Sequence, residues 1–179
     1  MDIKLIVNIA SRAWALPVLA ALHDGVPGRQ SRLIGATGAS RTAFGQSLEH
    51  LIACDLLERN PGHGHPLRPE FRLTPAGKQM AQKASQIMAA TPAPQHKILR
   101  RSWTLPVLTT LHEPQHFGLI KAQLGTISDR ALAQSLRVME DHNWLARHVS
   151  ADLRPPRPIY VAQNTGRLIS QITRSASPV

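Results

Sequence analysis

Two stretches of the sequence place arginine and glutamine side chains at helical spacing just after a serine. After Ser40 these are Arg41, Thr42 and Gln46, with Ser47 and His50 further along. After Ser128 they are Asp129, Arg130, Gln134 and Arg137. An arginine can bond guanine bidentately and a glutamine can bond adenine, each pair giving about 1–3 kcal/mol of discrimination between bases. On the exposed face of a helix, such side chains are suited to read the major groove of DNA.

Arginines also flank two loops that are rich in proline, and in one case in glycine and histidine. They are Arg68, Arg72, Arg154 and Arg157. At the tip of a two-stranded wing, such side chains are suited to contact the phosphate backbone or to enter a minor groove. We therefore predict that both loops carry DNA contacts.

The two serine-led stretches are not equivalent, because Asp129 stands where the other has Arg41. A carboxylate at this position would repel a phosphate but could accept a hydrogen bond from cytosine. The two stretches are therefore predicted to read different half-sites. Ser40 and Ser128 are predicted to cap their helices, and each hydroxyl could also bond a phosphate at the helix N-terminus.

A metal site is the alternative use of the histidines. His63 and His65 lie one residue apart, and His50 precedes them in the chain. Histidines can hold a metal or titrate near neutral pH, but no carboxylates or cysteines accompany these in a ligand pattern. We predict a polar loop tip, no metal and no cofactor.

The elements that must position these residues occur twice. Arg12-Ala-Trp-Ala-Leu-Pro-Val-Leu-Ala-Ala-Leu-His23 matches Arg101-Ser-Trp-Thr-Leu-Pro-Val-Leu-Thr-Thr-Leu-His112 at an offset of 89. The block from Ser40 to Leu48 matches that from Ser128 to Leu136 at an offset of 88. The offset returns to 89 further along, where Phe71, Gly77 and Lys78 align with Tyr160, Gly166 and Arg167. Because the blocks keep their order and the gaps fall between them, the chain is an internal repeat.

The hydrophobic periodicity, together with the glycines and prolines that interrupt it, predicts the same elements in each copy. In the first copy the predicted helices are 14–23, 29–36, a capped helix after Ser40, and 75–89. In the second copy they are 103–112, 117–124, a capped helix after Ser128, and 165–173. Turns are expected at 35–38 and 125–127, and strands at 57–59, 71–73, 145–149 and 159–161. Pro17 and Pro106 are expected in a first turn or at a kink. The stripe of Phe44, Leu48, Leu51 and Ile52 predicts the buried face of the third helix.

This order is that of a winged helix-turn-helix, so we predict a mainly α fold with small β-wings, built as two tandem winged helix-turn-helix domains (α+β). The prolines of Thr91-Pro-Ala-Pro-Gln95 cannot continue a helix and mark a linker. The predicted division is therefore domain 1 at 1–90, a linker at 91–96 and domain 2 at 97–179.

Composition limits the partners. The net charge of +10 favours polyanions. Up to residue 95 there are 10 basic and 6 acidic side chains, and beyond it 11 and 5, so both halves are basic. No unbroken apolar stretch of about 18 residues is present, and one cysteine allows no internal disulfide. We expect a cytoplasmic protein that does not enter a membrane.

At these residues the chain resembles the HxlR-type winged helix-turn-helix regulators of bacteria. Their opening helix has a run similar to Trp103-Thr-Leu-Pro-Val-Leu108 and Trp14-Ala-Leu-Pro-Val-Leu19, and their recognition helix begins like Ser128 to Leu136. Their wing ends in a pattern that Phe71-Arg-Leu-Thr-Pro-Ala-Gly-Lys78 follows and of which Tyr160 to Arg167 keeps mainly the ends. The likeness covers nearly the whole chain, once per copy.

The resemblance implies a transcriptional regulator that binds double-stranded DNA and dimerises to present two recognition helices. Here one chain holds both, so a pseudo-dimer is expected with its recognition helices about 34 Å apart, and further homodimerisation remains open. Many members also carry an N-terminal cysteine that senses oxidants or electrophiles. This chain has only Cys54, which we expect to be buried and inert.

Two other function classes fit the sequence less well. An enzyme is disfavoured because the sequence has no phosphate-cradling glycine loop, nucleophile elbow or HExxH motif. A protein-interaction scaffold of the chromosome-condensation type, which also uses tandem winged helices, is the second candidate. A scaffold has no need of basic charge in both halves, so DNA binding is preferred.

Overall fold

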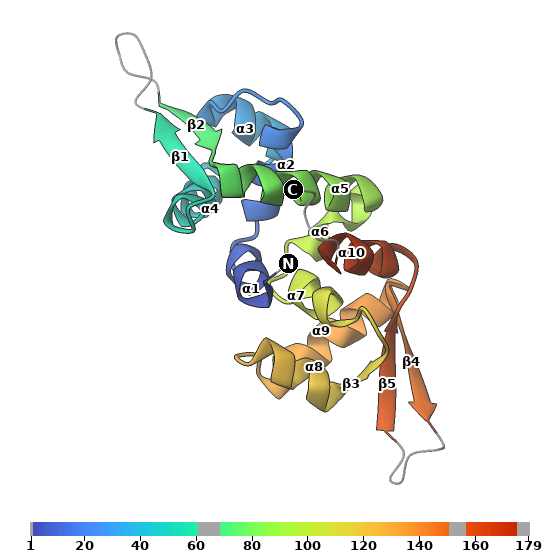
Figure 1. The fold of residues 1–179 in the computed structure, drawn as a ribbon. Helices are drawn as coiled ribbons and strands as arrows, with labels where there is room; N and C mark the ends of the chain where they lie inside the picture. The colour runs from blue at the N-terminus through green and yellow to red at the C-terminus, as the bar shows by residue number, and fades with distance from the viewer. Residues whose placement is uncertain (1, 61–68, 151–156, 175–179) are drawn as a thin grey trace. The chain divides into compact units, whose positions relative to one another are not determined.

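A computed structural model of the chain describes residues 2–60, 69–150 and 157–174 (Figure 1). The described chain is mainly helical with small antiparallel sheets, as predicted. It divides into two compact units, residues 12–92 and residues 1–11 together with 93–179. The division at residue 92 falls inside the proposed linker 91–96, whereas residues 1–11 group with the second unit and not with the first.

The unit of residues 12–92 follows the predicted order of elements. These are α2 (Ala15–His23), α3 (Gln30–Thr37), α4 (Arg41–Ala53), β1 (Leu57–Asn60), β2 (Glu70–Leu73) and α5 (Pro75–Ala90). Helix α2 packs along α5. Their contact is built from side chains that are almost wholly buried: Val18, Leu19, Ala81, Ala84 and Ile87. The small alanines of α5 let the two helices approach closely, which is what a tight helix pair requires.

The second unit repeats this order with additions. Its elements are α1 (Ile3–Ala10), η1 (Ala93–Gln95), α6 (His96–Leu99), α7 (Thr104–Thr110), β3 (Gln115–His116), α8 (Phe117–Leu124), α9 (Asp129–Asp141), β4 (Leu145–Ser150), β5 (Arg157–Ala162) and α10 (Asn164–Arg174). The three strands form an antiparallel sheet in the order β3-β5-β4. Pro17 in α2 and Pro106 in α7 both lie at the third helical position, so the predicted first-turn placement is confirmed.

Strand β3 was missed by the sequence analysis because two residues cannot show an alternating pattern. Gln115 pairs with Tyr160 and His116 with Ile159. In the first unit the corresponding contact is a single bridge between Arg29 and Glu70. Each unit therefore has the beginnings of a third strand that fixes the start of its helix-turn-helix against its wing.

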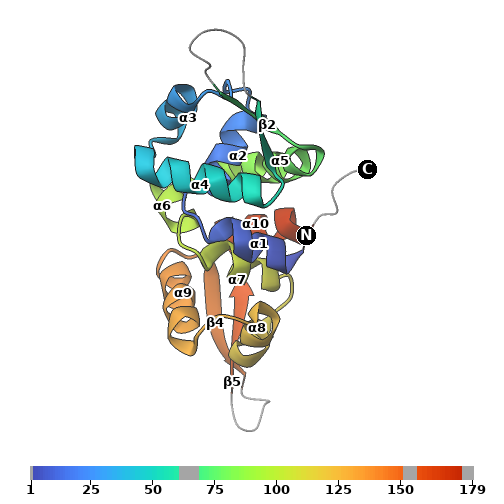
Figure 2. The ribbon, with the colours of Figure 1, turned by 90° about the vertical axis from the view of Figure 1, so that its left-hand side faces the viewer.

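Helix α1 was also missed, and it decides the composition of the second unit. It packs on α7 and α8, and Figure 2 shows it lying over α7. Ile6 and Ile9 are each 1% exposed. At the repeat offset of 89, Ile9 of α1 corresponds to Ile98 of α6. Helix α1 therefore precedes the first copy in the sequence, but it completes the core of the unit that holds the second copy.

In each unit a glycine at the matching position lets the last helix pack directly against the backbone of another segment. A Cβ atom at Gly77 would overlap the carbonyl oxygen of Leu56, and one at Gly166 would overlap that of Trp144. Both glycines lie in the first turn of the last helix, where it meets the start of the wing. The last helix therefore packs directly on backbone in both copies.

We expect Gly77→Ala or Gly166→Ala to lower the free energy of unfolding by about 3 kcal/mol, because a backbone carbonyl cannot yield as a flexible side chain would. Urea titrations followed by circular dichroism would measure this loss. Gly35→Ala in α3 is the matched control, since a Cβ there meets nothing within 4 Å. The control should gain about 0.5–1 kcal/mol from helix propensity. Equal effects at Gly35 and Gly166 would contradict the packing argument.

Candidate nucleic-acid interface

Both helix-turn-helix segments are shaped by the same local chemistry. Gly38 ends α3 at φ 72° and Gly125 ends α8 at φ 67°, a backbone conformation that favours glycine. The serine that follows each turn caps the next helix, as predicted: Ser40 Oγ accepts from the Ala43 amide at 3.3 Å and Ser128 Oγ from the Ala131 amide at 3.2 Å. The predicted break at Gly35 was placed too early, because α3 continues through Thr37.

The buried stripe of each capped helix fixes which face points outward. In α9, Leu132, Leu136 and Met139 are each 2% exposed or less. In α4, Phe44 and Leu51 are completely buried, whereas Ile52 is only half-buried. The candidate base-reading side chains lie on the opposite, exposed face: Arg41, Thr42 and Gln46 on α4, and Asp129, Arg130, Gln134 and Arg137 on α9.

Ser47 was named with this face but does not belong to it. Ser47 is 2% exposed and its hydroxyl donates to the Ala43 carbonyl at 2.9 Å. Ser135 does the same in α9, donating to Ala131 at 2.8 Å. These hydroxyls therefore bond a backbone carbonyl of their own helix four residues earlier, as a serine inside a helix can do. His50, also named with this face, is half-buried, and its Nε2 lies 3.7 Å from Cys54 Sγ.

The start of α9 carries an ion pair that alters its charge. Lys121 Nζ of α8 lies 2.6 Å from Asp129 Oδ1. Both side chains are substantially exposed, at 43% and 70%. An exposed pair contributes about 0–1 kcal/mol to stability, so its main effect is electrostatic. It occupies a lysine that would otherwise be available to a phosphate.

We expect Asp129→Asn to raise affinity for a duplex of arbitrary sequence roughly threefold at low salt, because Lys121 is released to contact a phosphate. Anisotropy titrations over a salt series would also show a steeper salt dependence. Asp141→Asn, at the exposed end of the same helix, removes an equal charge and is the control. If both variants gain equally, net charge alone is responsible and the ion pair is not.

The surface beside α4 holds two arginines that the sequence analysis did not single out, Arg29 and Arg32. Arg29, Arg32 and Arg41 line a hollow of about 590 Å³ together with Gln30, Ser31, Ile34 and Pro69. Arg29 and Arg32 are three residues apart at the start of α3, a spacing that could have indicated a shared face. Arg29 Nε donates to Glu70 Oε1 at 3.2 Å, which tethers it to β2.

Among the described residues of the second unit, the positions that match these three arginines carry no arginine or lysine. The positions that match Arg29 and Arg32 by their place before and within the helix are His116 and Leu119 in α8, and Arg41 is matched by Asp129. Leu119 is 47% exposed. The two helix-turn-helix surfaces therefore differ in charge far more than the recognition helices alone suggested.

The wings place two of the four predicted arginines on the described surface. Arg72 on β2 is exposed and its Nη2 lies 3.9 Å from Glu70 Oε2. Arg157 is exposed at the start of β5. Arg68 and Arg154 lie outside the described residues, as do His63 and His65. Arg59 on β1 and Arg147 on β4 are further exposed arginines at matching places that the analysis did not assign to the interface.

Comparison with protein families identifies both copies. The model of the HxlR-like helix-turn-helix family matches residues 9–93 and again residues 98–176. The chain belongs to the HxlR-like helix-turn-helix family. It is a tandem duplication of the HxlR-like unit, and such domains are typical of DNA-binding transcriptional regulators that are not enzymes. A search of curated proteins and a search of solved structures each gave no match.

The surroundings of Cys54, the single cysteine of this HxlR-like chain, favour its thiol form. Cys54 caps the C-terminus of α4, is half-buried, and has its Sγ 3.7 Å from Nε2 of His50. Burial raises the pKa of the Cys54 thiol. A raised pKa leaves little thiolate at neutral pH, and the thiolate is the reactive form.

Neither a metal centre nor a single membrane-spanning helix is found among the described residues. No group of three or more His, Cys, Asp and Glu side chains there is arranged to hold a metal ion. No single described helix is long and apolar enough to cross a membrane. The helices α1 and α2 pass that test only as a bent pair.

Proposed function

We propose that this protein is a sequence-specific regulator that binds double-stranded DNA with α4 and α9 in successive major grooves. One observation supports this most strongly. In both HxlR-like units a serine-capped helix, α4 or α9, buries its apolar stripe and exposes its arginine and glutamine side chains. Arg41 and Gln46 would read bases from α4, and Arg130 and Gln134 from α9. Thr42, Arg137, Asp129 and the capping serines complete the proposed contact set.

Phosphate contacts come mainly from the wings and from the arginine hollow of the first unit. Arg72 and Arg157 are proposed to meet the backbone, with Arg68 and Arg154 assigned to the same role from the sequence. Arg29 and Arg32 add a cationic surface beside α4. Because nonspecific affinity depends on the number of neutralised phosphates, these arginines should add to the affinity for a duplex of any sequence.

The duplication supports an internal pseudo-dimer. Two recognition helices in one chain would span half-sites about 34 Å apart, one turn of DNA. Because α9 begins with Asp129-Arg130 where α4 begins with Arg41-Thr42, the two half-sites should differ in sequence. A chain of this kind would bind an asymmetric site without needing a second copy, and further homodimerisation is a separate question that sedimentation would address.

The test is selection from a random duplex library, followed by fluorescence anisotropy with the enriched duplex and a scrambled one over a salt series. We expect a non-palindromic enriched site, binding that falls steeply with salt, and weaker binding to the scrambled duplex. The duplex upstream of the protein's own gene is the natural first candidate. No binding to any duplex at about 50 mM salt would overturn the proposal, because low salt strongly favours a basic binder. A protein-interaction scaffold would then be the better account.

A further inference from the structure

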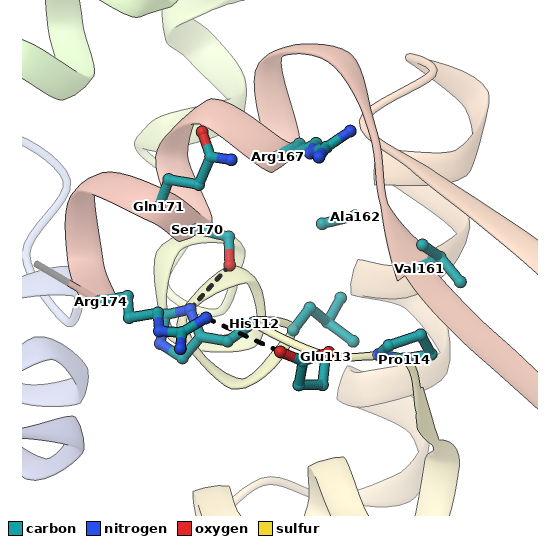
Figure 3. A pocket seen from close by; sticks show the side chains of 10 residues that line it. His112, Glu113, Pro114, Val161, Ala162, Arg167, Ser170, Gln171 and Arg174 are labelled. Atoms are coloured by element: carbon teal, nitrogen blue, oxygen red, sulfur yellow. Dashed lines mark hydrogen bonds and ion pairs between the residues drawn. The ribbon is translucent and has the colours of Figure 1, made fainter.

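A cavity of about 360 Å³ lies in the second unit, between the end of α7, the end of β5 and the outer side of α10 (Figure 3). Its apolar wall includes Leu111, Pro114, Val161 and Ala162. Its polar wall consists of His112, Glu113, Arg167, Ser170, Gln171 and Arg174. A concave site with an apolar wall and a few convergent polar groups is the usual form of a small-molecule site.

The polar wall is mostly one face of α10. Arg167, Ser170 and Arg174 are three, four and seven residues apart, so they lie along one side of the helix. Arg174 Nη1 lies 3.7 Å from Glu113 Oε1 across the rim. No carboxylate of a described residue pairs with Arg167, which projects beside Ala162 in Figure 3.

His112 lines the cavity as a hydrogen-bonded side chain. Its Nδ1 shares a hydrogen bond of 2.9 Å with Ser170 Oγ. Burial, followed by the nearby charge of Arg174, lowers the pKa of His112, which favours the neutral ring. With Arg174 balanced by Glu113, the cavity wall carries a surplus of one positive charge, contributed by Arg167.

The other copy of the repeat uses these positions differently. At an offset of 89, Lys78 matches Arg167, Ala81 matches Ser170 and Ser85 matches Arg174. Ser85 Oγ donates to Asp24 Oδ1 at 2.6 Å, so a neutral hydrogen-bond donor replaces the ion pair of Arg174 with Glu113. The fully buried Ala81 offers no hydroxyl to the neighbouring histidine position. The polar wall is therefore particular to the second unit and is not required by the fold.

We propose that this cavity binds a small organic carboxylate, with the guanidinium of Arg167 pairing with the carboxylate and the apolar part of the ligand resting on Pro114, Val161 and Ala162. A planar guanidinium donates two parallel hydrogen bonds to a carboxylate. A surplus of one positive charge matches a monoanion. Glu113 at the rim would repel a dianion such as inorganic phosphate. The volume lies in the lower part of the range for small-molecule sites.

Isothermal titration calorimetry of the full chain with benzoate, in the absence of DNA, tests the proposal independently of DNA binding. We expect saturable binding of one benzoate per chain, no comparable binding of uncharged benzamide and weaker binding of inorganic phosphate. Arg167→Met should weaken benzoate binding at least tenfold, about what loss of a charge-assisted hydrogen-bonded pair costs. Arg167→Lys, which keeps the charge but loses the planar fork, should fall between the two.

Lys78→Met is the matched control, since it removes the equivalent charge from the other copy and should leave benzoate binding unchanged. Circular dichroism of each variant separates loss of binding from loss of folding. The proposal is overturned if no saturable binding occurs up to about 10 mM benzoate, well above the Kd of a millimolar ligand. It is equally overturned if Arg167→Met binds benzoate as the unaltered protein does, or if benzamide binds as tightly as benzoate.

Discussion

Replacing Arg41 and Arg130 together by alanine is expected to weaken binding to the selected duplex about a hundredfold. The two side chains lie in the first turns of α4 and α9, on faces that the buried stripes direct outward. A bidentate arginine–guanine pair provides about 1–3 kcal/mol of discrimination, and two well-separated contacts add. Affinity for the scrambled duplex should fall much less. Fluorescence anisotropy at one fixed salt concentration gives both values.

The control for this variant removes two charges elsewhere. Lys4 on α1 and Lys97 on α6 are exposed and lie outside both helix-turn-helix segments. Their double alanine variant has the same net charge as the arginine variant. If the two double variants lose affinity for the selected duplex to the same extent, the arginines act only through net charge and do not read bases.

The largest stability effect is expected from Ile6→Ala with Ile9→Ala. Both side chains are 1% exposed in a helix that packs on α7 and α8. Each truncation should cost about 2–5 kcal/mol, from lost burial and the cavity left behind. That is comparable with the whole stability of a small domain, so the second unit should unfold in large part. Amide hydrogen exchange read by mass spectrometry locates the change.

The distribution of lost protection tests how the chain is divided. Peptides from residues 104–124 should lose protection, while peptides from residues 15–53 should keep most of theirs. Lys4→Ala, an exposed position on the same helix, should leave both sets unchanged. Loss of protection confined to residues 12–92 would mean that α1 stabilises the first unit, as the division at 91–96 alone had implied.

Local sequence signals predict where the two recognition helices begin and which of their faces is buried. A serine before an amphipathic stretch predicts an N-cap because its hydroxyl needs only the amide three residues on, and both Ser40 and Ser128 do cap. The stripe of Leu132, Leu136 and Met139 predicts which face is buried because helical periodicity is itself local. The repeat then gave the same answer twice.

Contacts between distant residues could not be predicted in this way. Arg29 is held by Glu70, and Asp129 is paired with Lys121 from the preceding helix. Nothing in the spacing of these residues specifies their partners, because such contacts depend on how whole elements pack.

The sequence by itself therefore determined the repeat, the order of the main helices and wing strands in each copy, the capping residues and the outward face of α4 and α9, because each depends on local periodicity or on side chains a few residues apart. Tertiary structure alone decided that α1 completes the second unit, that Arg29, Arg32 and Arg41 share one hollow, and that α10 and His112 enclose a cavity. The physical reason is that burial and charge pairing between elements depend on their approach in space, which a one-dimensional pattern does not contain.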